Sequence, residues 1–161
     1  MGAIFNVFPL ILIPVLIYNI WAFASTAGQG STPGAEIREH LRNGVFLRVP
    51  MASSEAVPGG VAGATQTVEW LFSFGDLLIL ISLVLLFIEL LKSTSTGTSA
   101  IFNHALSMLV FIICLVEFLL HPAFATSTFF FILIMSLLDV LAGVVVTIVS
   151  ARRDVEFAGN H

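Results

Sequence analysis

Four long apolar stretches dominate the pattern of hydrophobic and polar positions along the chain. They cover residues 4–24, 72–91, 101–120 and 129–149. Each has about the 20 residues that a helix needs to cross a ~30 Å hydrocarbon layer. A backbone in lipid must satisfy its own hydrogen bonds, which a helix does within one segment. The pattern therefore predicts an all-α membrane protein with four transmembrane helices in a single membrane domain, residues 1–161.

The first stretch carries several local signals. Residues 22–24 resemble a signal-peptidase site, but the residues before the stretch contain no Lys or Arg, which a secretory signal requires. We therefore expect a retained helix. Pro14 removes a hydrogen bond in the middle of the stretch and predicts a kink. Tyr18 and Trp21 have the amphipathic rings that settle at a membrane interface.

Basic residues at the span ends predict the orientation. Lys92 follows the second stretch, and Arg152 and Arg153 follow the fourth. All three then lie on one side of the membrane, which the positive-inside rule assigns to the cytoplasm. The arginines of segment 25–71 lie farther from the span ends and count less under that rule. We therefore expect an N-in/C-in topology, with segment 25–71 outside.

The outer segment, residues 25–71, is about 45 residues long, which exceeds an ordinary connection. Start and stop signals flank residues 33–42 and predict a short helix there. The runs 45–51 and 65–72 have extended character and predict a small β-hairpin lying on the outer membrane surface. In one interpretation the segment is a docking or lid element, and in the other it is a tether that covers the helix ends.

Polar and small residues inside the last three stretches recur three, four or seven positions apart, so each set lies on one helix face. Membrane helices approach and hydrogen-bond one another through such faces. The sequence therefore predicts a polar seam inside the bundle. The first stretch is nearly free of such groups, so we expect it at the periphery or against a partner. The packing members of the seam are Ser82, Ser107, Cys114, Ser136, Gly143 and Thr147, and the ionisable members are Glu89, His104, Glu117, His121 and Asp139.

The ionisable residues have two interpretations. In the first they form a proton or cation path with Asp139 at its midpoint, because intramembrane carboxylates and histidines are the usual parts of proton relays. In the second they are a hydrogen-bonded seam, in which Asp139 is protonated or bonded to a neighbouring helix. Glu117 then pairs with His121 one turn further on, and Glu89 snorkels beside Lys92.

Asp76 has alternatives of its own. Residues 73–76 read Ser-Phe-Gly-Asp, which matches a capping box, with Ser73 as the cap and Asp76 returning to its backbone N–H. In the path interpretation, Asp76 instead lies near the outer exit.

Composition narrows the function classes. Hydrophobic residues make up 58% of the chain and charged residues 10%, whereas soluble domains carry about 25% charged residues. The net charge of −4 gives no support to nucleic-acid binding. The single cysteine, Cys114, excludes an intramolecular disulfide. We find no phosphate-binding glycine loop or catalytic serine motif. Glu117 and His121 could supply two metal ligands, but no third ligand is evident by spacing. We therefore expect no enzyme activity, cofactor or metal.

One resemblance adds a setting. Residues 75–92, 104–107, 117–119 and 138–154 resemble small four-helix inner-membrane proteins of alphaproteobacteria. The resemblance covers mainly residues 72–154 and is tied to no motif of known chemistry. It implies a multi-pass protein of a bacterial inner membrane and supplies no activity.

Two functions from different classes remain. The first is an accessory or scaffold subunit without catalysis of its own, which associates with itself or with other membrane protein subunits and with membrane lipids. The second is a small oligomeric protein that conducts protons or ions through intramembrane carboxylates, chiefly Asp139 and Glu117.

Overall fold

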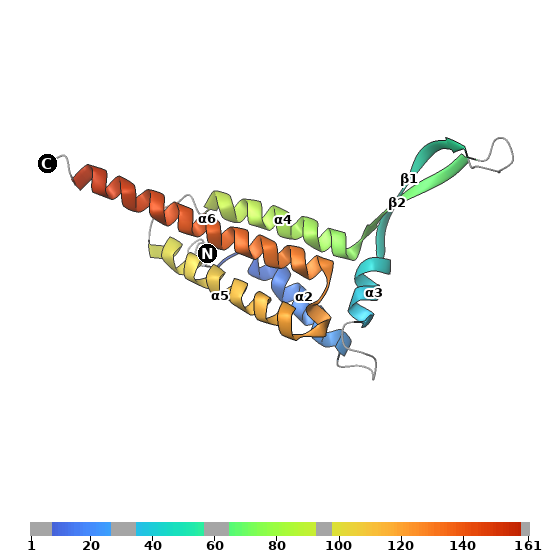
Figure 1. Cartoon of the computed structure of the whole chain (residues 1–161), viewed down its shortest axis with the longest axis horizontal. Helices are drawn as coiled ribbons and strands as arrows, with labels where there is room; N and C mark the ends of the chain where they lie inside the picture. The colour runs from blue at the N-terminus through green and yellow to red at the C-terminus, as the bar shows by residue number, and fades with distance from the viewer. Residues whose placement is uncertain (1–7, 27–34, 57–64, 93–97, 159–161) are drawn as a thin grey trace.

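The computed structural model describes residues 8–26, 35–56, 65–92 and 98–158. In these ranges, α2, α4, α5 and α6 form an elongated bundle in which successive helices alternate in direction (Figure 1). Helix α3 lies at one end of the bundle, and a two-stranded sheet projects from that end. The elements are α2 (Leu12–Thr26), α3 (Ala35–Asn43), β1 (Val45–Ala56), β2 (Thr65–Ser73), α4 (Phe74–Lys92), α5 (Thr98–Leu120), the short 3-10 helix η1 (Pro122–Phe124) and α6 (Ser127–Ala158).

Three of the helices are long and apolar enough to cross a membrane. Their apolar parts are Phe74–Lys92, Ile101–Leu120 and Ser127–Val149. Their outward faces carry large apolar side chains such as Phe87, which is 61% exposed, and hydrocarbon rather than water suits such a surface. These helices confirm three of the predicted spans and indicate a membrane protein.

Helix α2 differs from the predicted first span. Its 15 residues extend about 22 Å at 1.5 Å per residue, and residues 4–7 of the predicted span lie outside the described ranges. The mid-helix kink expected at Pro14 is wrong, because α2 begins at Leu12 and Pro14 lies in its first turn. The backbone N–H groups of a first turn have no partner within the helix, so proline costs little there.

Helix α2 also packs more deeply than its sequence suggested. One face of it, with Ile11 just before its start and then Val15, Tyr18 and Ala22, is almost fully buried in the core. The ring of Tyr18, which we expected at a membrane interface, contacts Phe129 with a centroid separation of 4.7 Å. One face of α2 is therefore part of the core, while Ile13, Ile17 and Ile20 on its other face are exposed.

The remaining helices keep the predicted order with shifted ends. Helix α5 ends at Leu120, two residues before Pro122, as expected because proline disfavours a helical residue before it. Helix α6 runs to Ala158, well beyond the predicted end at residue 149. Residues 150–158 contain neither Gly nor Pro, so nothing stops the helix there. The extended end of α6 lies opposite the hairpin (Figure 1).

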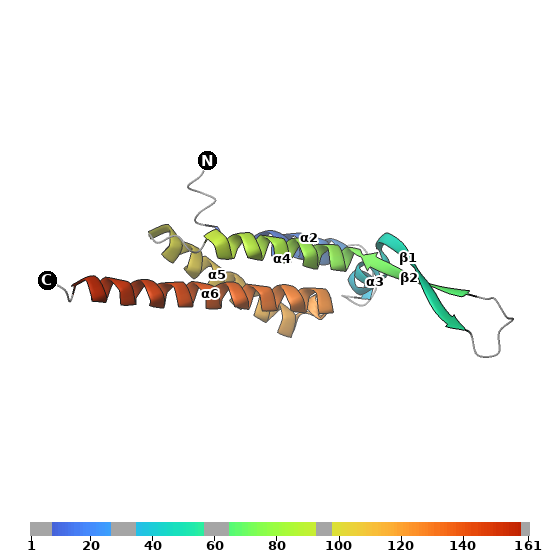
Figure 2. The ribbon, with the colours of Figure 1, turned by 90° about the horizontal axis from the view of Figure 1, so that it is seen from above.

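The outer segment forms the predicted short helix and hairpin. Helix α3 covers Ala35–Asn43, and β1 pairs antiparallel with β2, with Val49 opposite Trp70. The hairpin does not lie over the helix ends, however. It projects beyond the end of the bundle (Figure 2) and makes an angle with α4, into which β2 runs directly (Figure 1).

Candidate functional site

A fully buried carboxylate, Glu89, organises a polar cluster at the end of the bundle opposite the hairpin. Its Oε1 accepts a hydrogen bond from Asn103 Nδ2 at 2.5 Å and lies 3.1 Å from Lys92 Nζ. Its Oε2 accepts from the backbone N–H of Leu10 at 2.9 Å. A buried charge is tolerated when it is paired and hydrogen-bonded in this way. The expected snorkelling of Glu89 is therefore wrong, because its buried carboxylate joins α4 to α5 and to Leu10, just before α2.

Asp139 lies midway along the bundle and is bonded to the neighbouring helix. Ser107 Oγ on α5 donates to Asp139 Oδ2 at 2.5 Å, and both side chains are buried. Asp139 is thus bonded to α5, whereas Glu89 belongs to a separate polar cluster toward the end of the bundle.

The ring of His104 on α5 packs directly against Gly143 of α6. A Cβ added at Gly143 would collide with its imidazole ring, 2.9 Å from Cγ. Small residues allow such approaches between membrane helices. The buried Nδ1 of His104 has no hydrogen-bond partner within the described part of the chain.

Glu117 and His121 lie toward the hairpin end but do not pair with each other. Glu117 Oε2 accepts a hydrogen bond from Asn19 Nδ2 of α2 at 3.2 Å. The His121 ring caps η1 instead, its Nδ1 accepting from the backbone N–H of Ala123 at 3.2 Å. The predicted pairing across one turn is therefore wrong, since each side chain finds a partner outside α5.

Asp76 takes the capping role. Its Oδ2 accepts from the backbone N–H of Ser73 at 2.9 Å, and Ser73 Oγ accepts from the backbone N–H of Asp76 at 3.2 Å. These reciprocal bonds confirm the capping box and start α4 directly after β2.

The smaller residues of the seam hydrogen-bond to the backbone of their own helix or fill space between helices. Ser82 Oγ and Ser136 Oγ each donate to a backbone carbonyl of the same helix at 2.7 Å. Cys114 is fully buried. Thr147 differs from the rest, because it is exposed and donates to the carbonyl of Gly143. Four of the six predicted packing residues, Ser82, Ser107, Cys114 and Ser136, are therefore in the interior.

The ionisable residues form separate groups along the bundle. Among the described residues, no hydrogen bond links Asp139 to Glu89 or to Glu117. Buried apolar side chains such as Val110 and Met135 lie at intermediate levels. The same ranges contain no group of three His, Cys, Asp or Glu side chains placed to hold a metal ion. This arrangement can join helices, and proton transfer along it needs further carriers between the groups.

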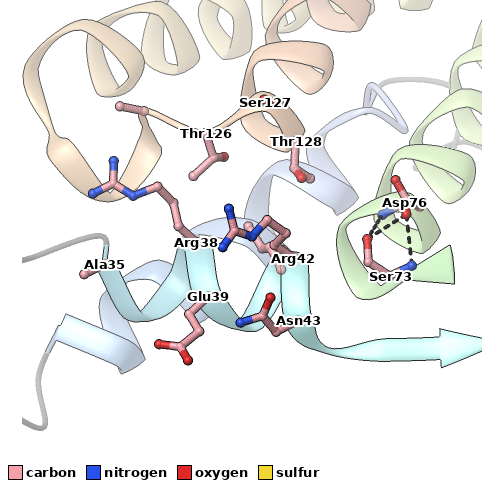
Figure 3. Close-up of a pocket in the computed structure, with 12 residues that line it drawn as sticks. Ala35, Arg38, Glu39, Arg42, Asn43, Ser73, Asp76, Thr126, Ser127 and Thr128 are labelled. Atoms are coloured by element: carbon pink, nitrogen blue, oxygen red, sulfur yellow. Dashed lines mark hydrogen bonds between the residues drawn. The ribbon is translucent and has the colours of Figure 1, made fainter. Parts of the chain in front are cut away.

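A cavity of about 670 Å³ lies outside the seam, between α3 and the starts of α4 and α6. Arg38 and Arg42 extend from one face of α3 toward the turn before α6, while Glu39 extends away from it (Figure 3). Thr126 caps α6 there, its Oγ1 accepting from the backbone N–H of Phe129 at 3.1 Å. The cavity therefore combines two guanidinium groups with the beginning of a 32-residue helix.

An apolar groove of about 370 Å³ adjoins this cavity and shares part of its wall. Residues 125–127 line both spaces. The groove is otherwise lined by aromatic rings, Phe118, Phe130 and Phe131. A basic polar space and an aromatic space thus meet at the turn between η1 and α6.

Sequence reasoning missed this pair of spaces. The four-residue separation of Arg38 and Arg42 within the predicted helix already placed both on one face. Their meeting with α6 depends on how the outer segment folds back, which no local pattern encodes. Comparisons with protein families, with curated proteins and with solved structures find no match for this chain.

Proposed function

We propose that the protein is a non-enzymatic accessory or scaffold subunit of a bacterial inner membrane, which associates with itself or with a larger membrane complex. In this proposal α2, completed by the residues before it, forms a fourth span, and both chain ends face the cytoplasm. The basic residues Lys92 and Arg152 at the end opposite the hairpin support that orientation.

The observation that carries the proposal is the exposed apolar hairpin. Trp70 and Leu71 are neighbours in the regularly paired part of β2, so they lie on opposite faces of the sheet, and they are 52% and 48% exposed. Phe46 and Leu47 on β1, next to an irregularity in the pairing, are 58% and 49% exposed. Both faces are therefore apolar, although the hairpin projects beyond the ends of the three apolar helices (Figure 2). Exposed apolar patches of this kind mark interaction sites.

The polar interior supports the same proposal. Glu89, Asp139 and Glu117 each bond to a group on another helix, so their polar groups hold the bundle together. The bundle then presents apolar side chains to lipid, and the hairpin is left to engage a protein partner. A two-stranded hairpin is marginally stable alone, so a partner that covers its faces also stabilises it.

The experiment is native mass analysis after extraction from membranes in mild detergent. We expect the wild type in a stoichiometric assembly, and we expect Phe46→Ser with Trp70→Ser to weaken that assembly by about tenfold or more, because aromatic anchors dominate interfaces. Glu39→Gln, an exposed substitution on α3 outside the hairpin, is the control and leaves the assembly intact. A monomeric wild type would contradict the proposal.

A conducting protein is the second candidate, favoured by one observation. Asp139 and Glu89 are buried carboxyl groups inside the bundle, and intramembrane carboxyl groups are the usual parts of proton relays. Proton flux into liposomes that contain the wild type or Asp139→Asn decides the matter. Loss of flux in the variant supports conduction, whereas equal flux or none in both proteins rejects it.

A further inference from the structure

We propose that the cavity between α3 and α6, together with the adjoining groove, binds an anionic phospholipid. The phosphate lies between Arg38, Arg42 and the first turn of α6, and an acyl chain lies along Phe130 and Phe131. This inference does not depend on the proposed function, because it concerns a different part of the molecule.

The charges in the cavity call for an anion. Arg38 and Arg42 lie one turn apart on α3, where like charges repel each other, and both are exposed. Neither guanidinium makes a hydrogen bond or ion pair with any residue that the structure describes. A phosphate accepts from the planar guanidinium groups in a matching geometry, and it relieves their repulsion.

The acidic residues of the cavity wall leave this anion site open. Glu39 extends to the opposite side of α3 from the two arginines (Figure 3). Asp76 is committed to the capping box, where its Oδ2 accepts from Ser73 N–H at 2.9 Å and from Ser73 Oγ at 2.7 Å.

The start of α6 adds to the positive potential. The first backbone N–H groups of a helix have no partner within it and carry the positive end of its dipole. Ser127 and Thr128 supply such groups on the cavity wall. Both residues line the same cavity as the two guanidinium groups, so a phosphate bound there lies at the positive end of α6.

The adjoining groove selects a lipid over a soluble phosphate. Its aromatic rings line a space of about 370 Å³, and Phe131 is 50% exposed. Because both spaces share residues 125–127, a ligand with a charged head next to an apolar tail fills them together. The site also lies where the apolar part of α6 begins at Ser127, which is the level of the lipid headgroups if α6 spans the membrane.

The test is native mass spectrometry of the detergent-purified full chain with three probes. Phosphatidylglycerol carries phosphate and tails, diacylglycerol carries the tails alone, and glycerol 3-phosphate carries the phosphate alone. We expect phosphatidylglycerol to bind about tenfold or more tightly than either partial probe, because only it fills both spaces.

The variants assign the binding to this site. Arg38→Gln with Arg42→Gln weakens phosphatidylglycerol binding by about tenfold or more, each single change weakens it in part, and Phe131→Ala weakens it too. Arg48→Gln, an exposed arginine of the hairpin, is the matched control and changes it by less than about twofold. Thermal unfolding without lipid shows that the variants stay folded. Unchanged binding in the double variant, or equal binding of glycerol 3-phosphate and phosphatidylglycerol, overturns the proposal.

Discussion

Ser107 on α5 and Asp139 on α6 are joined by a hydrogen bond of 2.5 Å between two buried side chains. Removal of the donor leaves the Asp139 carboxyl without this partner in the interior, so Ser107→Ala lowers the free energy of unfolding by about 1–3 kcal/mol. Denaturant titration in detergent micelles measures the change. Ser136→Ala is the control, because Ser136 Oγ bonds only to the carbonyl of Leu133 in its own helix. Equal losses in the two variants would show that the bond between the helices contributes nothing.

The buried ion pair of Glu89 and Lys92 predicts that removal of one charge lowers the stability of the protein strongly. Glu89→Gln keeps the shape of the side chain but leaves Lys92, only 16% exposed in its side chain, without its counter-charge. Breaking a buried pair in this way costs about 3–5 kcal/mol.

The double variant Glu89→Gln with Lys92→Met should recover part of that loss, because neither charge is then left unpaired. The cycle of single and double variants gives the coupling energy of the pair. Strictly additive losses would mean that the two charges do not stabilise each other.

The close approach at Gly143 predicts a compensating pair of substitutions. Gly143→Ala places a methyl group against the ring of His104 and destabilises the bundle by about 1–3 kcal/mol through overpacking. His104→Ala removes the obstructing ring, so stability falls less on adding Gly143→Ala to that variant than on adding it to the wild type. Thermal unfolding of the four proteins measures the difference, and the same loss in both backgrounds would contradict the observed contact between Gly143 and the His104 ring.

The proposed orientation predicts opposite labelling at the two ends of the molecule. In a Cys114→Ser background, Arg48→Cys on the hairpin should react with a membrane-impermeant thiol reagent in intact cells. Arg152→Cys on α6 should react only after the membrane is permeabilised, because basic span ends face the cytoplasm. The reverse labelling pattern would show the opposite topology. Labelling of both sites from outside would contradict the placement of the two ends on opposite sides of the membrane.

Local patterns predicted the parts of the fold that depend on neighbouring residues. The capping box of Ser73 and Asp76 lies within four residues, and the hairpin strands are close in sequence. The three long helices follow from apolar runs that leave a backbone in lipid no alternative.

Contacts between distant segments could not be predicted in the same way. Glu117 was assigned to His121 because both lie on α5, yet its partner is Asn19 on α2, and no periodicity within one helix reveals a second helix. Tyr18 has the side chain of an interfacial residue, but its hydroxyl donates to the carbonyl of Ala123 at 3.0 Å inside the core. This hydrogen bond to a distant residue holds Tyr18 in the core, although its side chain suggested a place at the membrane interface.

The junction of β2 and α4 has a mechanical consequence. Strand β2 ends at Ser73 and α4 begins at Phe74, so no linker separates them, and the capping box stiffens the joint. A linker would absorb a pull on the hairpin, whereas this joint transmits it as tension and torque to α4. A displacement of the base of the hairpin is therefore carried to the start of α4 or strains the two reciprocal bonds between Ser73 and Asp76.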